Sequence, residues 1–190
     1  MDFSLAEKEL ERAKRCIDRM EQSKTYDEYD ESWSDFLSRI ENIYTKIKLI
    51  AESDRRWSGF VSPYNKLRAN DELLSYLKQA RNSVHHGISE ISKHIQGGIG
   101  INPAPGEDSV TINSLHSDGH GNIYIDSQRP VTIKRIPDRI EAVTIVNRQQ
   151  TFTPPNNHKN IPLTENNPII YANHAIDFYT DLLTNAKGYF

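Results

Sequence analysis

Apolar residues recur every three or four positions in several stretches of the first hundred residues, the spacing of one helix face. Residues 3–22 form the first stretch, and residues 26–53 form the second. The apolar stripe of the second stretch is wide and rich in large side chains: Trp33, Phe36, Leu37, Ile40, Ile43, Tyr44, Ile47 and Ile50. We therefore predict two amphipathic helices, with the second central to the core. Ser4 followed by Glu7 fits a capping box at the first helix.

Residues 54–70 then form a connection that is long for a helical bundle. It contains the breakers Gly59 and Pro63, with basic and aromatic side chains interleaved. Such a mixture is typical of surfaces that stack bases and pair phosphates, and also of aromatics that close the end of a bundle beside solvated cations. We favour the structural role for Trp57 and Phe60, and both alternatives stay open for the arginines.

A third helix is predicted to begin at Asn70 or Asp71, either of which is a good N-cap. Its apolar positions are Leu73, Leu77, Ala80, Val84, Ile88, Ile91 and Ile95. Gly97 and Gly98 follow, so we expect the helix to end there.

From residue 99 to about residue 147 the periodicity changes from helical to alternating, which predicts strands. Residues 110–114 and 122–126 flank a Gly-rich turn, and residues 131–136 and 140–146 flank the turn signal Pro137-Asp138-Arg139. We therefore expect two hairpins that form a small antiparallel sheet.

A Pro/Asn-rich linker covers residues 148–167, and Asn167-Pro168 then resembles the N-cap and first residue of a last helix. The predicted fold is mainly α: an antiparallel four-helix bundle with a small β-sheet inserted between the third and fourth helices. The expected parts are residues 1–98 for the first three helices, 99–163 for the insertion and linker, and 164–190 for the fourth helix.

Net charge, cysteine content and the length of apolar runs limit the partners and the cellular compartment that we expect for this protein. The 190 residues carry a formal net charge of -3, which gives no general electrostatic case for nucleic acid or an acidic membrane. Cys16 is the one cysteine, so an intrachain disulfide is excluded and a reducing compartment is favoured. The N-terminus lacks a secretory apolar region and no apolar run is long enough to span a membrane. We expect a soluble cytoplasmic protein.

Residues 80–87, Ala-Arg-Asn-Ser-Val-His-His-Gly, place four polar groups on the third predicted helix. On an ideal helical wheel with Leu77 at zero, Arg81 lies at about 40° and His85 at about 80°. By the same rule Asn82 lies at about 140° and His86 at about 180°. Arg81 and His86 thus diverge by about 140°, so one helix cannot easily hold them as a compact pair. They would meet a partner placed against that face, such as a second copy of the helix.

These residue types suit phosphodiester chemistry without a metal. Histidine can take or give a proton near neutral pH, and arginine offers a planar fork to phosphate oxygens. The alternative from the residues alone is a solvated face or a dimer contact. His116 and His120 lack a third ligand at a telling spacing, so we expect exposed turn residues rather than a metal site, and no cofactor.

The order Arg81-Asn82, three residues, then His86 resembles the R-x4-6-H motif of the HEPN superfamily, in which a polar residue often follows the arginine. Residues 71–77 and His86-Gly87-Ile88 also resemble a group of bacterial HEPN-like proteins, and the likeness covers residues 1–97 and 165–187. It implies a bundle of four antiparallel helices with the motif on the third, and a homodimer with facing motifs.

The resemblance further implies a metal-independent endoribonuclease of toxin–antitoxin or antiphage systems, with RNA as substrate and a cognate antitoxin or effector as a possible partner. By position Arg81, Asn82 and His86 are the expected catalytic residues and His85 an accessory, while Arg55, Arg56 and Lys78 are candidates for RNA contact. Other HEPN members are inactive dimerisation or protein-binding modules, and this alternative stays open.

Overall fold

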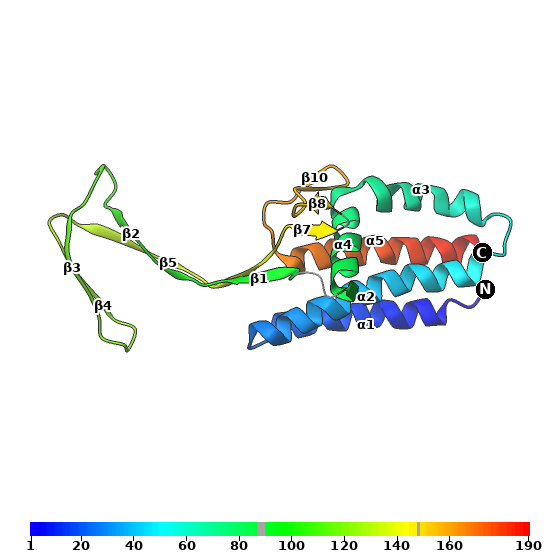
Figure 1. Ribbon diagram of the computed structural model, residues 1–190, viewed down its shortest axis with the longest axis horizontal. Coiled ribbons are helices and arrows are strands. Elements are labelled where there is room, and N and C mark those ends of the chain that lie inside the picture. Colours follow the sequence, from blue (N-terminus) through cyan, green and yellow to red (C-terminus); the bar gives the residue numbers. More distant parts are fainter. Residues whose placement is uncertain (87–89, 148) are drawn as a thin grey trace. The chain divides into compact units, whose positions relative to one another are not determined.

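The computed structural model describes residues 1–86, 90–147 and 149–190, and for His85 and His86 the backbone alone. It is a mixed structure with five helices and small antiparallel sheets (Figure 1). The helices are α1 (Ser4–Gln22), α2 (Tyr26–Ala51), α3 (Trp57–Asn70), α4 (Glu72–His86) and α5 (Pro168–Tyr189). Strands form a substantial share of the second half of the chain.

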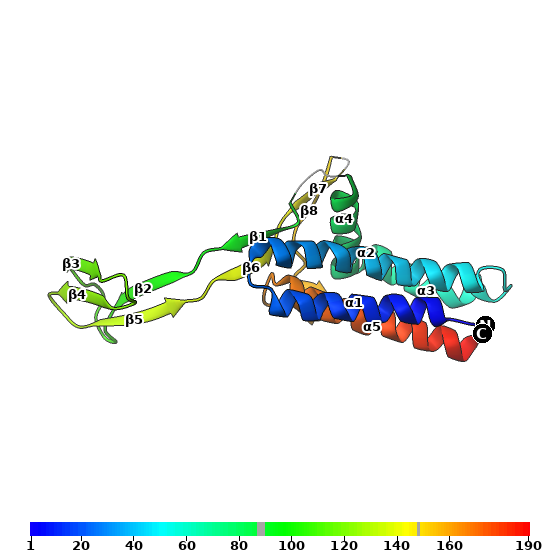
Figure 2. The same cartoon turned by 90° about the horizontal axis from the view of Figure 1, so that it is seen from below.

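Two long helices, α1 and α2, form an antiparallel pair, and α5 packs against both of them. Figures 1 and 2 show α3 running along the same direction, whereas α4 lies across the long helices in both views. The two chain ends lie close together at one end of this group, where Lys187 on α5 pairs with Glu7 on α1. The motif residues 81–86 are therefore on the fourth helix of the chain and not on the third.

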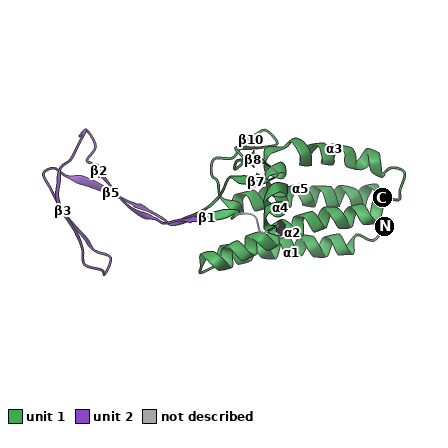
Figure 3. Ribbon diagram, viewed as in Figure 1, with its two compact units in different colours: residues 1–93, 140–190 green, residues 94–139 purple. Residues whose placement is uncertain are grey.

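The chain divides into two compact units (Figure 3). Unit 1 contains residues 1–93 and 140–190, and unit 2 contains residues 94–139. The strands after residue 140, which we expected within the insertion, belong to unit 1 with the helices. The structure thus ends the inserted unit at residue 139, well before the expected boundary at residue 163.

The predicted apolar stripes form the core of unit 1. Trp33 and Phe36 of α2 are fully buried and stack with ring centroids 5.6 Å apart. On α5, Tyr171 and Phe178 are also buried. Each large apolar side chain removed from water contributes roughly 1.5–3 kcal/mol, so these stripes account for the association of α1, α2 and α5.

A helix, α3, occupies most of the segment that we expected to be an irregular connection. Pro63 lies inside it, where a proline removes a helical hydrogen bond and crowds the preceding turn. Packing at the end of the helices offsets this cost: Phe60 lies 5.2 Å from Phe190 and Tyr64 lies 6.1 Å from Phe178, ring to ring. The prediction that Trp57 and Phe60 pack against the helices is confirmed.

The predicted third helix is shorter than expected, because α4 ends at His86 and strand β1 begins at Ser92. Ile91 is buried, but it is not a helix position. The backbone carbonyl of Ser92 accepts a 2.6 Å hydrogen bond from Tyr26, and its hydroxyl donates to Asp30 at 2.6 Å. The spacing of the isoleucines is compatible with a helix or a strand. The hydrogen bonds between Ser92 and the α2 residues Tyr26 and Asp30, about sixty residues away in sequence, favour the strand.

The described strands pair two by two, and all the pairs with a given register are antiparallel. The pairs are β1 (Ser92–Ile95) with β6 (Arg139–Ala142), β2 (Gly98–Pro103) with β5 (Val131–Ile136), β3 (Ile112–Ser117) with β4 (Ile123–Ser127), β7 (Ile145–Asn147) with β8 (Gln150–Phe152), and β9 (Asn157–His158) with β10 (Ile161–Pro162).

The hairpin across the Gly-rich turn is confirmed as β3–β4. The second predicted hairpin is wrong, because β5 pairs with β2 and β6 pairs with β1. Asp138 does not reverse the chain; its carboxylate accepts the backbone N–H of Gly97 at 2.7 Å and so joins the outgoing and returning strands. The expected linker 148–167 also contains β8, β9 and β10.

The N-termini of two helices test the predicted N-caps. Asn167 caps α5 by accepting the N–H of Ile169 at 2.9 Å, as predicted. The predicted capping box at α1 is wrong: Phe3 is the N-cap, and Ser4 bonds to Asp2 instead.

Asp71 caps α4 and also anchors the β9–β10 hairpin. Its carboxylate accepts the N–H of Leu74 at 3.0 Å and of Lys159 at 2.8 Å, and it lies 2.9 Å from Nδ1 of His158. Both side chains of the Asp71–His158 pair are almost fully buried. Burial works to raise the pKa of Asp71, but these hydrogen bonds outweigh it and hold the pKa below its usual value.

Replacing Asp71 should therefore destabilise unit 1. Removing one member of a buried pair leaves the other unpaired, so Asp71→Ala should lower the free energy of unfolding by about 3 kcal/mol. Chemical denaturation measures this, and the exposed Asp177 on α5 provides a matched control, with Asp177→Ala expected to change stability by less than about 0.5 kcal/mol. Equal effects of the two substitutions would contradict the anchoring role.

The same pair predicts a pH dependence. Because folding lowers the pKa of Asp71, its ionised form contributes stability that is fully present above the unfolded pKa, about 3.9, and is lost as pH falls further. The difference in unfolding free energy between wild type and Asp71→Asn should therefore be constant above about pH 5 and shrink below about pH 4. A difference that is unchanged down to about pH 3 would refute the assignment.

Candidate active site

The helix α4, which carries the predicted motif, is covered on two sides. Leu73, Leu77 and Ala80 are fully buried, on the side that packs on α2 and α5. On another side the hydroxyl of Tyr76 donates to the carbonyl of Val143 at 2.7 Å, and Gln79 accepts from Asn147 of β7 at 2.8 Å. Arg81 borders the side that faces α2 and α5.

Arg81 and Asn82 are both half-buried and lie side by side. The guanidinium Nη1 of Arg81 donates to Oδ1 of Asn82 at a long 3.4 Å. The Nε of Arg81 is buried and has no hydrogen-bond partner among the described atoms. A guanidinium has five donor hydrogens, so most of the donor capacity of Arg81 is unused.

A narrow crevice beside Arg81, about 10 Å³ in volume and so no larger than one water molecule, is formed by three helices. Leu37, Ile40 and Glu41 of α2 line it together with Tyr179 of α5, and Leu74, Leu77, Lys78 and Arg81 of α4 complete it. Lys78 is exposed and borders the same crevice as Arg81, one helical turn earlier. The structure therefore places two cations, Lys78 and Arg81, in the lining of a crevice that also holds the carboxylate of Glu41.

The carboxylate in this crevice is already paired with another arginine. Arg68 of α3 donates to Glu41 at 2.6 Å, and its guanidinium lies 3.6 Å above the ring of Tyr44. Burial opposes the charge of Arg68, but Tyr179 and Glu41 outweigh this and hold its pKa above the usual value. Burial raises the pKa of Tyr179 to about 12, so this phenol stays neutral at physiological pH.

Three arginines are partly buried in the described part of the chain: Arg39, Arg68 and Arg81. Arg39 pairs with Glu9 and Arg68 with Glu41, whereas Arg81 has no carboxylate partner among the described residues. A partly desolvated guanidinium without an anion is poised to bind one, because charge-assisted hydrogen bonds are strong there.

Of the other predicted residues whose side chains are described, Asn82, Arg55 and Arg56 do not line this crevice. His86 is the last residue of α4, and its side chain and that of His85 lie outside the described residues. Arg55 and Arg56 precede α3, whose fourteen residues, about 20 Å of helix, separate them from the start of α4 (Figure 1).

Arg56 in particular has internal partners. It bonds to both carboxylate oxygens of Asp54 and to the backbone carbonyl of Tyr189, and this lowers the pKa of Asp54 to about 2. Arg55 is exposed. The contacts of Arg56 hold the α2–α3 turn against the C-terminal end of α5, which is a structural role.

Sequence patterns did not indicate Glu41, Arg68 or Tyr179 as neighbours of the motif. Each lies on a different helix, and no local spacing relates them. One signal was present: polar Glu41 adjoins the buried stripe of α2, and an acidic residue there requires a partner.

Within the described residues, no three His, Cys, Asp or Glu side chains are close enough to hold a metal ion. Among the helices described, none combines the length and apolar composition that crossing a bilayer requires. A scan against protein-family models, a search of curated proteins and a search of solved structures each return no match.

The Arg68–Glu41 pair generates a stability prediction. Arg68→Ala should lower the free energy of unfolding by about 3 kcal/mol, because the Arg68 side chain is 11% exposed and Glu41 would lose its partner in the interior. The exposed pair of Lys14 and Glu11 is the contrast, and Lys14→Ala should cost about 1 kcal/mol or less. Thermal or urea denaturation would show the difference; comparable losses would indicate that Arg68 is solvated.

Proposed function

We propose that this chain is a HEPN-type, metal-independent endoribonuclease that acts in a homodimer cleft. One observation carries the proposal: Arg81 is partly buried, lies beside Asn82 and lacks a carboxylate partner among the described residues. It lies five residues before His86, the final residue of the same helix. An arginine that has no carboxylate partner among the described residues is suited to bind a phosphate.

The corresponding fold proposal is a HEPN-like four-helix bundle made by α1, α2, α4 and α5, with α3 as an addition. Its support is that α4 packs on α2 and α5, and that α1, α2 and α5 contact one another. The setting we propose is toxin–antitoxin or antiphage defence, with an antitoxin or effector protein as a partner.

In the proposed reaction His86 of one chain takes the proton of a ribose 2′-hydroxyl. The 2′-oxygen attacks the phosphorus, and the bond from phosphorus to the 5′-oxygen breaks. His86 of the partner subunit gives a proton to that oxygen, leaving a 2′,3′-cyclic phosphate and a 5′-hydroxyl. Arg81 stabilises the charge that develops on the phosphoryl oxygens, and Asn82 positions the guanidinium.

A cleavage assay with total RNA in the presence of EDTA tests this proposal. His86→Ala and Arg81→Ala should each lower the cleavage rate by at least about 100-fold, because each removes proton transfer or charge stabilisation from the transition state. Arg81→Lys should recover little activity, since lysine keeps the charge but lacks the planar fork.

Arg15→Ala is the matched control, because Arg15 is an exposed arginine on α1 away from the crevice, and its cleavage rate should equal that of wild type. Wild-type protein that is folded yet cuts no RNA, or retained cleavage in both His86→Ala and Arg81→Ala, would overturn the proposal.

A second candidate function is a catalytically inactive HEPN-like module for dimerisation or protein binding. The exposed apolar side chains of unit 2 favour it, since such side chains are typical of interaction surfaces. Under this alternative no concentration of the protein degrades RNA, and Arg81→Ala lowers dimer stability instead.

A further inference from the structure

Unit 2 has apolar strands but no core. None of its residues, 94–139, is buried, and Ile99, Leu115, Tyr124 and Ile133 are each about half exposed. An isolated two-stranded hairpin is at best marginally stable in water, and three or more strands with an apolar face are needed for stability. Unit 2 contains two such two-stranded pairs, the β3–β4 hairpin and the pair of β2 with β5, between which that hairpin lies in sequence. Its strands therefore need further strand pairing.

The β2–β5 pair has one apolar and one polar face. Residues directly opposite in an antiparallel pair share a face. One face therefore holds the pairs Ile99–Arg135, Ile101–Ile133 and Pro103–Val131, and the other holds Gly98–Ile136, Gly100–Lys134 and Asn102–Thr132. This alternation predicts a sheet that buries one face, although this pair alone leaves that face open.

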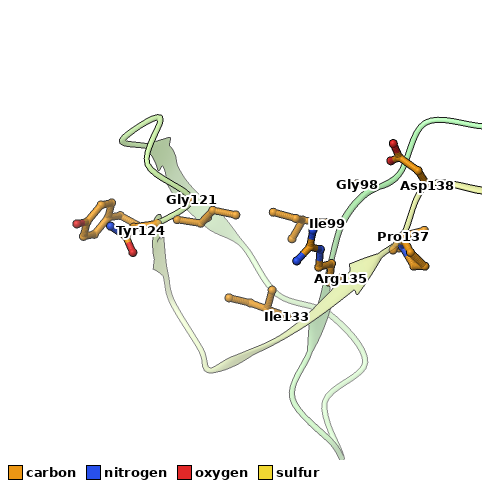
Figure 4. A pocket seen from close by; sticks show the side chains of 11 residues that line it. Gly98, Ile99, Gly121, Tyr124, Ile133, Arg135, Pro137 and Asp138 are labelled. Carbon is orange, nitrogen blue, oxygen red and sulfur yellow. The ribbon is translucent and has the colours of Figure 1, made fainter. Parts of the chain in front are cut away.

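A hollow lies between the two strand pairs of unit 2. Ile99, Ile133 and Arg135 line it from β2–β5, and Ile123 and Tyr124 line it from β3–β4. Figure 4 shows the side chains of Ile99, Ile133 and Arg135 directed into this space. The apolar face of β2–β5 thus borders an unfilled space.

Of the strands in unit 2, β2 has the least protected edge. Charged residues and bulges normally prevent a strand edge from pairing with another chain. β5 carries Lys134 and Arg135, β4 carries Asp126, and β3 has an irregular register between Ile112 and Ser114. β2 carries no charge and no bulge, and it has open space beside Gly98. Pro103, which lacks an N–H, protects only the end of the strand, so the open edge is residues 98–102.

We propose that two copies of the chain associate through unit 2, with the free edge of β2 paired antiparallel with β2 of the second copy. The result is a four-stranded sheet in the order β5–β2–β2–β5, which passes the threshold that a single hairpin does not reach. A strand paired antiparallel with its own copy satisfies a two-fold axis, the commonest symmetry of dimers.

Charge favours a second copy as the occupant. In this arrangement Lys134 and Arg135 lie on the outer strands, whereas pairing through β5 would bring these cations of two copies together. Unit 2 as a whole has five acidic and four basic residues, so two copies have little net repulsion. The contact does not involve α4 and does not depend on whether the chain cuts RNA.

The mass of the assembly in solution tests this contact on the full chain. Wild type should have at least twice the mass of one 21.8 kDa chain, and Ile101→Lys should halve the mass at the same concentration. A lysine there puts a charge on the face and edge that two copies share. Thr132→Lys is the matched control, because it adds the same charge to the polar face of the outer strand, and it should leave the mass unchanged.

Hydrogen exchange of wild-type protein provides a test that requires no variant. In the isolated β2–β5 pair, alternate N–H groups of β2 point to water and exchange fast. In the dimer the consecutive amides of residues 99–102 should all be protected, and dilution should remove this protection. A single-chain mass at all concentrations, a mass unaffected by Ile101→Lys, or alternating protection would each overturn the proposal and leave the edge available to another protein.

RNA cleavage separates this inference from the proposed function. If the α4 cleft forms through its own separate contact, wild type should have four times the mass of one chain. Ile101→Lys should then have twice that mass and still cut RNA at the wild-type rate. If wild type cuts no RNA but the masses and protection follow the expectation, the nuclease proposal fails and the β2 contact stands.

Discussion

The position of α4 depends on one buried carboxylate. Asp71 caps the helix, bonds to His158 and accepts the N–H of Lys159, so a single side chain joins the start of α4 to the β9–β10 hairpin. The cap satisfies helix donors that have no partner within the helix, and the histidine compensates the burial of the charge. Because α4 holds Arg81 and Asn82, the geometry of the candidate site depends on this anchor.

Chemistry at the site depends on how charge is distributed among four helices. Glu41 on α2 is the acidic residue in the crevice, and it is paired with Arg68 from α3. With Glu41 held by Arg68, Arg81 has no carboxylate partner among the described residues. The helix α3 thus contributes to the site without carrying a motif residue, because it supplies the cation that neutralises Glu41.

Unit 2 differs from unit 1 in that its apolar side chains are not buried in a core. In unit 1 the apolar stripes of three long helices face one another and bury Trp33, Phe36 and Tyr171 completely. In unit 2 the alternation of apolar and polar residues is equally clear in β2 and β5, but two-stranded pairs give the apolar faces nothing to cover them. An amphipathic pattern without a core indicates a surface that is completed by association.

Local patterns in the sequence determined the elements whose contacts lie close along the chain. The stripes of α1, α2 and α5, the caps at Asp71 and Asn167 and the β3–β4 turn were predictable, because each follows from the chemistry of a few neighbouring residues. The contact between Arg81 and Asn82 was not predicted, because the helical wheel placed them about 100° apart. Spacing alone also indicated that His86 points elsewhere on the helix, which made a second chain part of the proposal.

Tertiary structure decided what depends on distant partners. Packing of Phe60 against Phe190 offsets Pro63 and makes α3 a helix, and Tyr26 and Asp30 hold Ser92 in a strand where helical spacing continued. Asp138 joins two strands instead of forming a turn, because Gly97 donates to it from forty-one residues away. The pairing of Glu41 with Arg68, which leaves Arg81 without a carboxylate partner among the described residues, likewise arises between helices. These outcomes depend on which surfaces meet, and periodicity within one segment contains no information about that.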